Sequence, residues 1–139
     1  MDLALALIVI FLIWFAAFLV THLGTYRPSM VAHPKTGPQF VLTLLIAVSA
    51  GFTEEIMFRG LFLRQFHLLT GNMAVAVGVQ SFVFALAHGG NQSIAEFLKH
   101  CFSGCLFAGL AISRKSLWLA ILAHVLLDMM AITVMFLRR

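Results

Sequence analysis

Apolar residues occupy five long runs of the chain, separated by short stretches of polar and turn-forming residues. The first run is long enough to cross a hydrocarbon core of about 30 Å at about 1.5 Å per residue of helix. The second run exceeds a single crossing, so we expect it to tilt or to extend beyond the bilayer. The pattern therefore predicts five helical membrane segments, over residues 3–23, 39–69, 73–88, 94–113 and 117–137.

The ends of these runs carry start and stop signals for helices. Gly71 and Asn72 are expected to end the second segment. Ser93, with Glu96 three residues later, forms a capping box at the start of the fourth. Small residues let helices approach closely, so the fourth segment is expected to pack tightly at two glycines, Gly104 and Gly109.

The composition favours a membrane bundle over a soluble fold. The 139 residues are 62% hydrophobic and only 10% charged, which leaves too few polar side chains to cover a soluble protein. We predict an all-α, polytopic membrane helix bundle of about five transmembrane segments around a polar intramembrane cavity. It is expected to be a single membrane domain over residues 1–139, in which an extra N-terminal helix and loop (1–38) precede the core (39–137).

The formal net charge of +4 would, in a soluble protein, raise the question of a nucleic-acid partner. The positions of the charges argue against it, because membrane proteins hold basic residues beside anionic headgroups. The lipid bilayer, and not nucleic acid, is the partner that this pattern indicates. Most of the basic residues lie in short segments at the ends of the apolar runs: Arg27, Lys35, Arg64, Arg114, Lys115, Arg138 and Arg139.

The most costly stretch for a membrane helix extends from residue 51 to 60 and contains Glu54, Glu55 and Arg59. A charged side chain at the centre of a membrane helix costs about 2.5–3.5 kcal/mol, so three exposed to lipid would cost on the order of 8–10 kcal/mol. These side chains must therefore face a protein interior or a wet cavity.

Three pairs of residues share a spacing of four, which places both members on one helix face. They are Glu55 with Arg59, Phe84 with His88, and His124 with Asp128. Glu55 and Arg59 can neutralise each other as a purely structural pair, and His88 can serve as a C-terminal histidine of its helix. Glu54 lies about 100° around the helix from Glu55 and has no partner there, so we expect it to work with a group from another helix.

One free carboxylate and two histidines can hydrolyse an amide. A carboxylate beside a neutral imidazole can take a proton from water, and a second imidazole can donate a hydrogen bond to the developing oxyanion. The polar residues of the apolar runs therefore predict a hydrolase.

The three motifs resemble those of a known family in their order and in their placement on separate segments. Glu54-Glu55-x-x-x-Arg59, Phe84-x-x-x-His88 and His124-x-x-x-Asp128 are similar to the motifs of the CPBP family, the CAAX protease and bacteriocin-processing intramembrane endopeptidases that include the type II CAAX prenyl endopeptidase. The resemblance covers residues 39–131. It implies a glutamate-type intramembrane protease with no cofactor and no metal.

By this resemblance Glu54 is the catalytic base that activates water together with His88, while His124 and Asp128 form the oxyanion site. Eukaryotic relatives carry Asn at the last position, and an ionised Asp cannot donate the hydrogen bond that Asn can. Asp128 must then be protonated, or must orient His124 instead. The residues implied to support the motifs are Glu55, Arg59 and Phe84.

The chain has fewer membrane segments than the typical member of that family. This is compatible with a minimal active domain and with a form that needs a partner protein or an oligomer. We expect a multi-pass protein of the bacterial cell membrane. Its substrate is expected to be a peptide or a membrane protein, and the sequence does not distinguish prenylated CAAX substrates from leader peptides.

Other functions fit less well. A metalloprotease would want His-Glu-x-x-His, which the sequence lacks, and a rhomboid-type serine protease would want Gly-x-Ser-Gly where residues 101–104 read Cys-Phe-Ser-Gly. The alternative from another class is a non-catalytic membrane protein of the bacteriocin-immunity or scaffold type, or a proton-coupled carrier that uses the same residues as a relay. The inverted repeat of many carriers is not visible in the sequence.

Overall fold

The computed structural model of the chain describes residues 2–22, 34–89 and 92–137. These residues form helices and their connecting turns, as the all-α prediction requires. Most of the predicted loop over residues 24–38 lies outside the described residues, as do Arg27, Arg138 and Arg139. The elements are α1 (Asp2–His22), α2 (Gly37–Glu55), the π-helical segment η1 (Ile56–Phe62), α3 (Leu63–Thr70), α4 (Met73–Ala87), α5 (Ile94–Arg114) and α6 (Trp118–Leu137).

The helix ends follow local capping chemistry. Thr36 caps α2 in a capping box with the side chain of Gln39. Gly71 ends α3 in the left-handed conformation at φ 65°, and Asn72 then caps α4. The predicted capping box at the start of α5 is confirmed, with the Ser93 hydroxyl accepting from the Glu96 backbone and the Glu96 carboxylate accepting from the Ser93 backbone.

The helices have the dimensions and surface of a membrane bundle. Within the described residues, three helices are long and apolar enough to span a membrane: residues 37–70, α5 and α6. Helix α4 and the apolar part of α1 are shorter. Large apolar side chains such as Leu45 and Leu69 are 62% and 79% exposed, whereas Glu55 is 0% exposed. Many large apolar side chains face outward while Glu55 and Arg59 are buried, as expected for a protein solvated by lipid.

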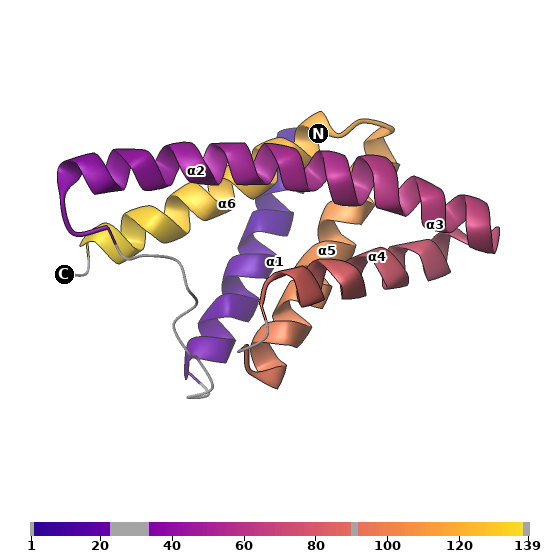
Figure 1. The fold of residues 1–139 in the computed structure, drawn as a ribbon, viewed down its shortest axis with the longest axis horizontal. Helices are drawn as coiled ribbons and strands as arrows, with labels where there is room; N and C mark the ends of the chain where they lie inside the picture. The colour runs from indigo at the N-terminus through magenta and orange to yellow at the C-terminus, as the bar shows by residue number, and fades with distance from the viewer. Residues whose placement is uncertain (1, 23–33, 90–91, 138–139) are drawn as a thin grey trace.

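Helices α2 and α6 lie side by side and antiparallel (Figure 1). The Phe40 ring near the start of α2 stacks on the Phe136 ring near the end of α6, at a centroid distance of 4.5 Å. Further along, a Cβ atom on Gly51 would come within 2.9 Å of the Val125 side chain. Glycine therefore lets the two helices approach just before the costly stretch begins.

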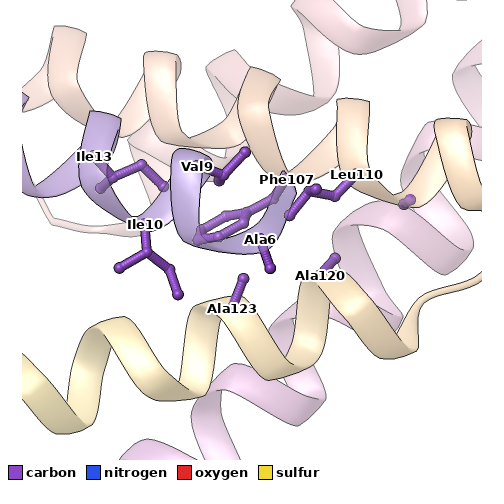
Figure 2. Packing of buried hydrophobic residues seen from close by; sticks show 9 residues of the cluster. Ala6, Val9, Ile10, Ile13, Phe107, Leu110, Ala120 and Ala123 are labelled. Atoms are coloured by element: carbon purple, nitrogen blue, oxygen red, sulfur yellow. The ribbon is translucent and has the colours of Figure 1, made fainter. Parts of the chain in front are cut away.

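Helix α1 packs across α5 and α6 through small and branched side chains (Figure 2). The aromatic ring of Phe107 lies among aliphatic side chains contributed by all three helices. This cluster supports α5 and α6 close to the polar residues of the bundle. Its buried members are Ala6, Val9, Ile10, Ile13, Phe107, Leu110, Ala111, Ala120 and Ala123.

Helices α4 and α5 cross at a glycine. A Cβ atom on Gly104 would lie 2.8 Å from the Cβ atom of Ser81, so the predicted close approach at Gly104 is confirmed. The same prediction for Gly109 was wrong, because no described atom beyond its own helix backbone lies within 4 Å of its Cβ position. Five residues further along α5, Gly109 points about 140° away from the α4 contact.

The second predicted segment is one continuous helical element over residues 37–70, as expected, but its centre is π-helical. The backbone N–H of Leu63 donates to the carbonyl of Phe58, five residues earlier. The π-helical segment begins directly after Glu55 and contains Arg59. Such wide turns occur often at functional sites, and this one bears Arg59, one of the three residues of the first motif.

Candidate active site

The structure brings all seven residues predicted for the site into one cluster. The first motif lies at the junction of α2 and η1, the second at the C-terminal end of α4, and the third near the middle of α6. These elements are distant in sequence and adjacent in space. The residues are Glu54, Glu55, Arg59, Phe84, His88, His124 and Asp128.

One half of the cluster is buried and centred on Glu55. A single carboxylate oxygen, Oε1, lies 2.7 Å from Nη1 of Arg59 and 2.7 Å from Nδ1 of His124. The Glu55, Arg59 and His124 residues are only 0%, 4% and 5% exposed. The pairing of Glu55 with Arg59 is as predicted, while the bond to His124, 69 residues away, was not predicted.

Aromatic rings and one carbonyl surround the buried guanidinium. The Arg59 Cζ atom lies 4.4 Å from the Phe84 ring centroid and 5.2 Å from that of Phe107. Its Nη2 donates to the carbonyl oxygen of Gly104 at 3.3 Å. Phe107 also stacks on the His124 ring at 4.8 Å and 13°. Cation–π contacts stabilise a cation where water is excluded, which gives Phe84 a physical role in the second motif.

The hydrogen bonds assign the tautomer of His124. Because Oε1 of Glu55 accepts from Arg59, it is an ionised acceptor, and Nδ1 of His124 must be the donor. The Nε2 atom of His124 then points toward the other half of the cluster, where it lies 3.9 Å from Glu54 Oε2 and 3.7 Å from Asp128 Oδ2.

The other half of the cluster is partly open. The side chains of Glu54, His88 and Asp128 are 29%, 27% and 37% exposed. The Oε2 atom of Glu54 lies 3.8 Å from Nε2 of His88 and 3.9 Å from Nε2 of His124. These separations exceed a direct hydrogen bond and suit a bridging water. Glu54 thus faces both histidines, as the sequence predicts.

His88 is held by the backbone of its own helix. Its Nδ1 atom lies 2.8 Å from the carbonyl oxygen of Phe84, so Nδ1 carries the proton and donates. In the neutral ring, Nε2 is therefore an acceptor, and it is the atom that faces Glu54. The Phe84 carbonyl, which has no intrahelical donor at the end of α4, thus fixes this tautomer of the His88 ring.

Helix α5 contributes residues that the sequence analysis missed. The His100 ring stacks on the His88 ring at a centroid distance of 4.4 Å and 27°, and His100 Nδ1 lies 2.9 Å from Gln92 Oε1. A signal was present in the sequence, because positions 96, 99, 100 and 103 are polar within an apolar run and share one helix face.

Two rival chemistries can be compared with this geometry. Within residues 2–22, 34–89 and 92–137, no three histidine, cysteine or carboxylate side chains are arranged to hold a metal ion. The Ser103 hydroxyl, part of the sequence closest to a rhomboid motif, donates to the carbonyl of Lys99 at 2.8 Å within its own helix.

A family model described as "Type II CAAX prenyl endopeptidase Rce1-like" matches residues 36–130. The matched region begins at the cap of α2, includes every residue of the cluster and ends two residues after Asp128. No curated protein and no solved structure matches the chain. The family is one of proteases, and the apolar helices agree with a place in the membrane. Because the match spans well over half of its length, this integral membrane protein belongs to the Rce1-like family of type II CAAX prenyl endopeptidases.

Proposed function

We propose that the chain is a glutamate-type intramembrane endopeptidase, which hydrolyses a peptide bond with a water molecule activated by Glu54 and His88. The observation that carries the proposal is that one oxygen atom of Glu54 faces histidines from two other helices. Oε2 of Glu54 lies 3.8 Å from Nε2 of His88 and 3.9 Å from Nε2 of His124. A water molecule in this gap can donate one hydrogen bond to Glu54 and one to His88, which directs its lone pairs at a substrate.

In the proposed reaction, the water oxygen attacks the scissile carbonyl carbon while Glu54 takes one of its protons. The tetrahedral intermediate then collapses, the C–N bond breaks, and the proton held by Glu54 passes to the leaving amine. The nucleophile is consumed and the carboxylate is regenerated, so no covalent enzyme intermediate is needed.

His124 is proposed to stabilise the oxyanion. Its Nδ1–H is already bonded to Glu55, so it can donate from Nε2 only as an imidazolium. Three carboxylates favour that cation: Glu55 at 2.7 Å from Nδ1, and Asp128 and Glu54 at 3.7 Å and 3.9 Å from Nε2. This supports Asp128 as an ionised residue that orients and charges His124 rather than as a second donor.

The substrate is proposed to be a peptide or a segment of a membrane protein that reaches the site from the bilayer. The family description names CAAX prenyl substrates, and a leader peptide would offer the same scissile amide. The proposed chemistry requires only a scissile amide, and the residues of the cluster do not distinguish prenylated CAAX substrates from leader peptides. The substrate must therefore be found by experiment.

Replacement of Glu54 by Gln tests the proposal. Loss of a general base lowers turnover by about 10²–10⁴-fold, and we expect that loss in protein reconstituted into liposomes. The substrate is first identified by comparing the proteomes of membranes that contain wild-type or Glu54→Gln protein. Wild-type turnover by the variant, or no cleavage product dependent on Glu54, would overturn the proposal.

Glu96→Gln is a matched control. It removes another buried carboxylate from the bundle, while a Gln at this position still completes the capping box of α5. Turnover and thermal stability close to wild type are expected for this variant, so a loss seen only with Glu54→Gln is specific to the site.

A further inference from the structure

The ring of His88 is contacted by two other rings. Phe84, one turn earlier on α4, lies at a centroid distance of 4.4 Å with the planes at 53°. His100, which comes from α5, lies at the same distance of 4.4 Å with the planes at 27°. The contact from α5 is close to parallel stacking, so it limits rotation of the His88 ring out of its plane.

His100 is itself fixed by a hydrogen-bonded bridge. The Nε2 of Gln92 donates to the carbonyl oxygen of Ala85 in the last turn of α4, at 2.7 Å. This bond orients the amide, so its oxygen must be the acceptor from Nδ1–H of His100 at 2.9 Å. The bridge ties the end of α4 to α5 through Gln92, two residues before α5 begins.

The hydrogen bond from His88 Nδ1 to the Phe84 carbonyl does not prevent one rotation of the His88 ring. The ring can still swing about this bond, and the swing would carry Nε2 away from the point that it shares with Glu54. A ring stacked against the face of His88 opposes this swing. His100 has such a ring, and it belongs to none of the three motifs.

We propose that His100, held by Gln92, is a positioning residue that keeps Nε2 of His88 aimed at Glu54. The role assigned to His88 in the cleavage reaction rests on the proposed function, while the packing role rests on the stacking geometry alone. His100 acts through the shape and orientation of its ring, so a phenyl ring should replace it in part and a methyl group should not.

Kinetics of reconstituted protein test the proposal. Small misplacements of a catalytic group lower rates strongly, so His100→Ala is expected to lower kcat by about tenfold with little change in KM. His100→Phe keeps a flat ring and is expected to recover most of that loss. Gln92→Ala, which frees the His100 ring without removing it, should fall between wild type and His100→Ala. His67→Ala, on α3, is the matched control and should leave kcat unchanged.

A second measurement does not depend on cleavage. In protein with ¹⁵N-labelled histidine, two-bond ¹H–¹⁵N spectra report the tautomer of His88, assigned by the peaks lost in His88→Gln. Because the bond to Phe84 is kept, the Nδ1–H tautomer should dominate in all three proteins. The His88 peaks should be sharp in wild type and His100→Phe, and they should shift and broaden in His100→Ala, where the ring can swing. A change in the spectra without any Glu54-dependent cleavage would reject the proposed function and keep the packing role.

Two results would overturn the positioning role. One is a His100→Ala protein with wild-type kcat and an unchanged His88 signal. The other is a His100→Phe protein as impaired as His100→Ala in both measurements, because the ring would then not be what matters.

Discussion

Glu54 and Glu55 are neighbours in sequence, yet the structure places them in opposite environments. The Glu55 side chain is 0% exposed and its Oε1 accepts from two donors at 2.7 Å, while the Glu54 side chain is 29% exposed and its Oε2 lies 3.8 Å or more from both histidines. One residue of helix turns a side chain by about 100°. That rotation separates a buried half of the cluster, the dry half, from a partly exposed half, the open half.

The two halves differ in what a carboxylate can do. In the dry half, the Oε1 atom of Glu55 already accepts hydrogen bonds from Arg59 and from His124, so this oxygen is committed to structure. In the open half, the Oε2 atom of Glu54 is buried and has no hydrogen-bond partner among the described residues, so no bond must be broken before it can accept a proton. His124 bonds Glu55 through Nδ1 and faces Glu54 through Nε2, and it joins the two halves.

The largest effect that separates the halves should be on stability. Glu55→Gln leaves Arg59 as an uncompensated charge in a site where it is 4% exposed. Removing one partner of a buried ion pair costs about 3–5 kcal/mol, so we expect a marked fall in the unfolding midpoint in detergent. Glu54→Gln should unfold close to wild type, because its side chain is partly exposed and has no short bond to lose.

Comparing the stability of the two variants tests this division between Glu54 and Glu55. If Glu54→Gln lowered the unfolding midpoint as much as Glu55→Gln, both carboxylates would be structural and the division would be wrong. Glu55→Gln combined with Arg59→Met removes both charges, and it should recover part of the stability lost by Glu55→Gln alone.

A smaller effect is expected at the glycine that supports the dry half. An added Cβ on Gly104 would meet Ser81 at 2.8–2.9 Å, and the Gly104 carbonyl accepts from Arg59 and from Gln80. Gly104→Ala should therefore lower the free energy of unfolding by about 1–3 kcal/mol through overpacking. Gly109→Ala is the matched control on the same helix and meets no atom within 4 Å. Equal unfolding midpoints for the two variants would contradict this close packing.

Local and periodic features were predictable from the sequence. The five helical segments followed from apolar runs and capping residues, and the pair of Glu55 with Arg59 followed from a spacing of four. A partner for Glu54 from another helix was expected because an unpaired carboxylate in lipid needs one, and the family resemblance indicated the histidines. These inferences depend on one helix at a time, or on the cost of leaving a charge unpaired.

Contacts that depend on how helices cross were not predictable. The bond from His124 to Glu55 joins residues 69 apart, and nothing local distinguishes Glu55 from Glu54 as its acceptor. Gly109 was expected to be a packing position because it is small, but its direction on α5 turns it away from α4. The stacking of His100 on His88 was not predictable for the same reason, because it depends on how α4 and α5 pack against each other.

The smallest predicted effect concerns Asp128, at the edge of the open half. Its carboxylate lies 3.7 Å from Nε2 of His124 and is 37% exposed, so it acts through charge at a distance and through solvent. Asp128→Asn removes the charge and keeps the shape. We expect turnover to fall by about three- to tenfold, which corresponds to roughly 0.7–1.4 kcal/mol of transition-state stabilisation.

The turnover of Asp128→Asn distinguishes two possible roles of Asp128. Asn can donate a hydrogen bond and an ionised Asp cannot. If Asp128 served as a neutral donor to the oxyanion, Asp128→Asn would keep full turnover, and Asp128→Ala would lose it. If Asp128 acts through charge on His124, both variants should lose activity, with the loss in Asp128→Asn growing as added salt is reduced, because screening already weakens the wild-type interaction at high salt. Turnover measured for both variants across ionic strength therefore distinguishes a second donor from a charge that keeps His124 protonated.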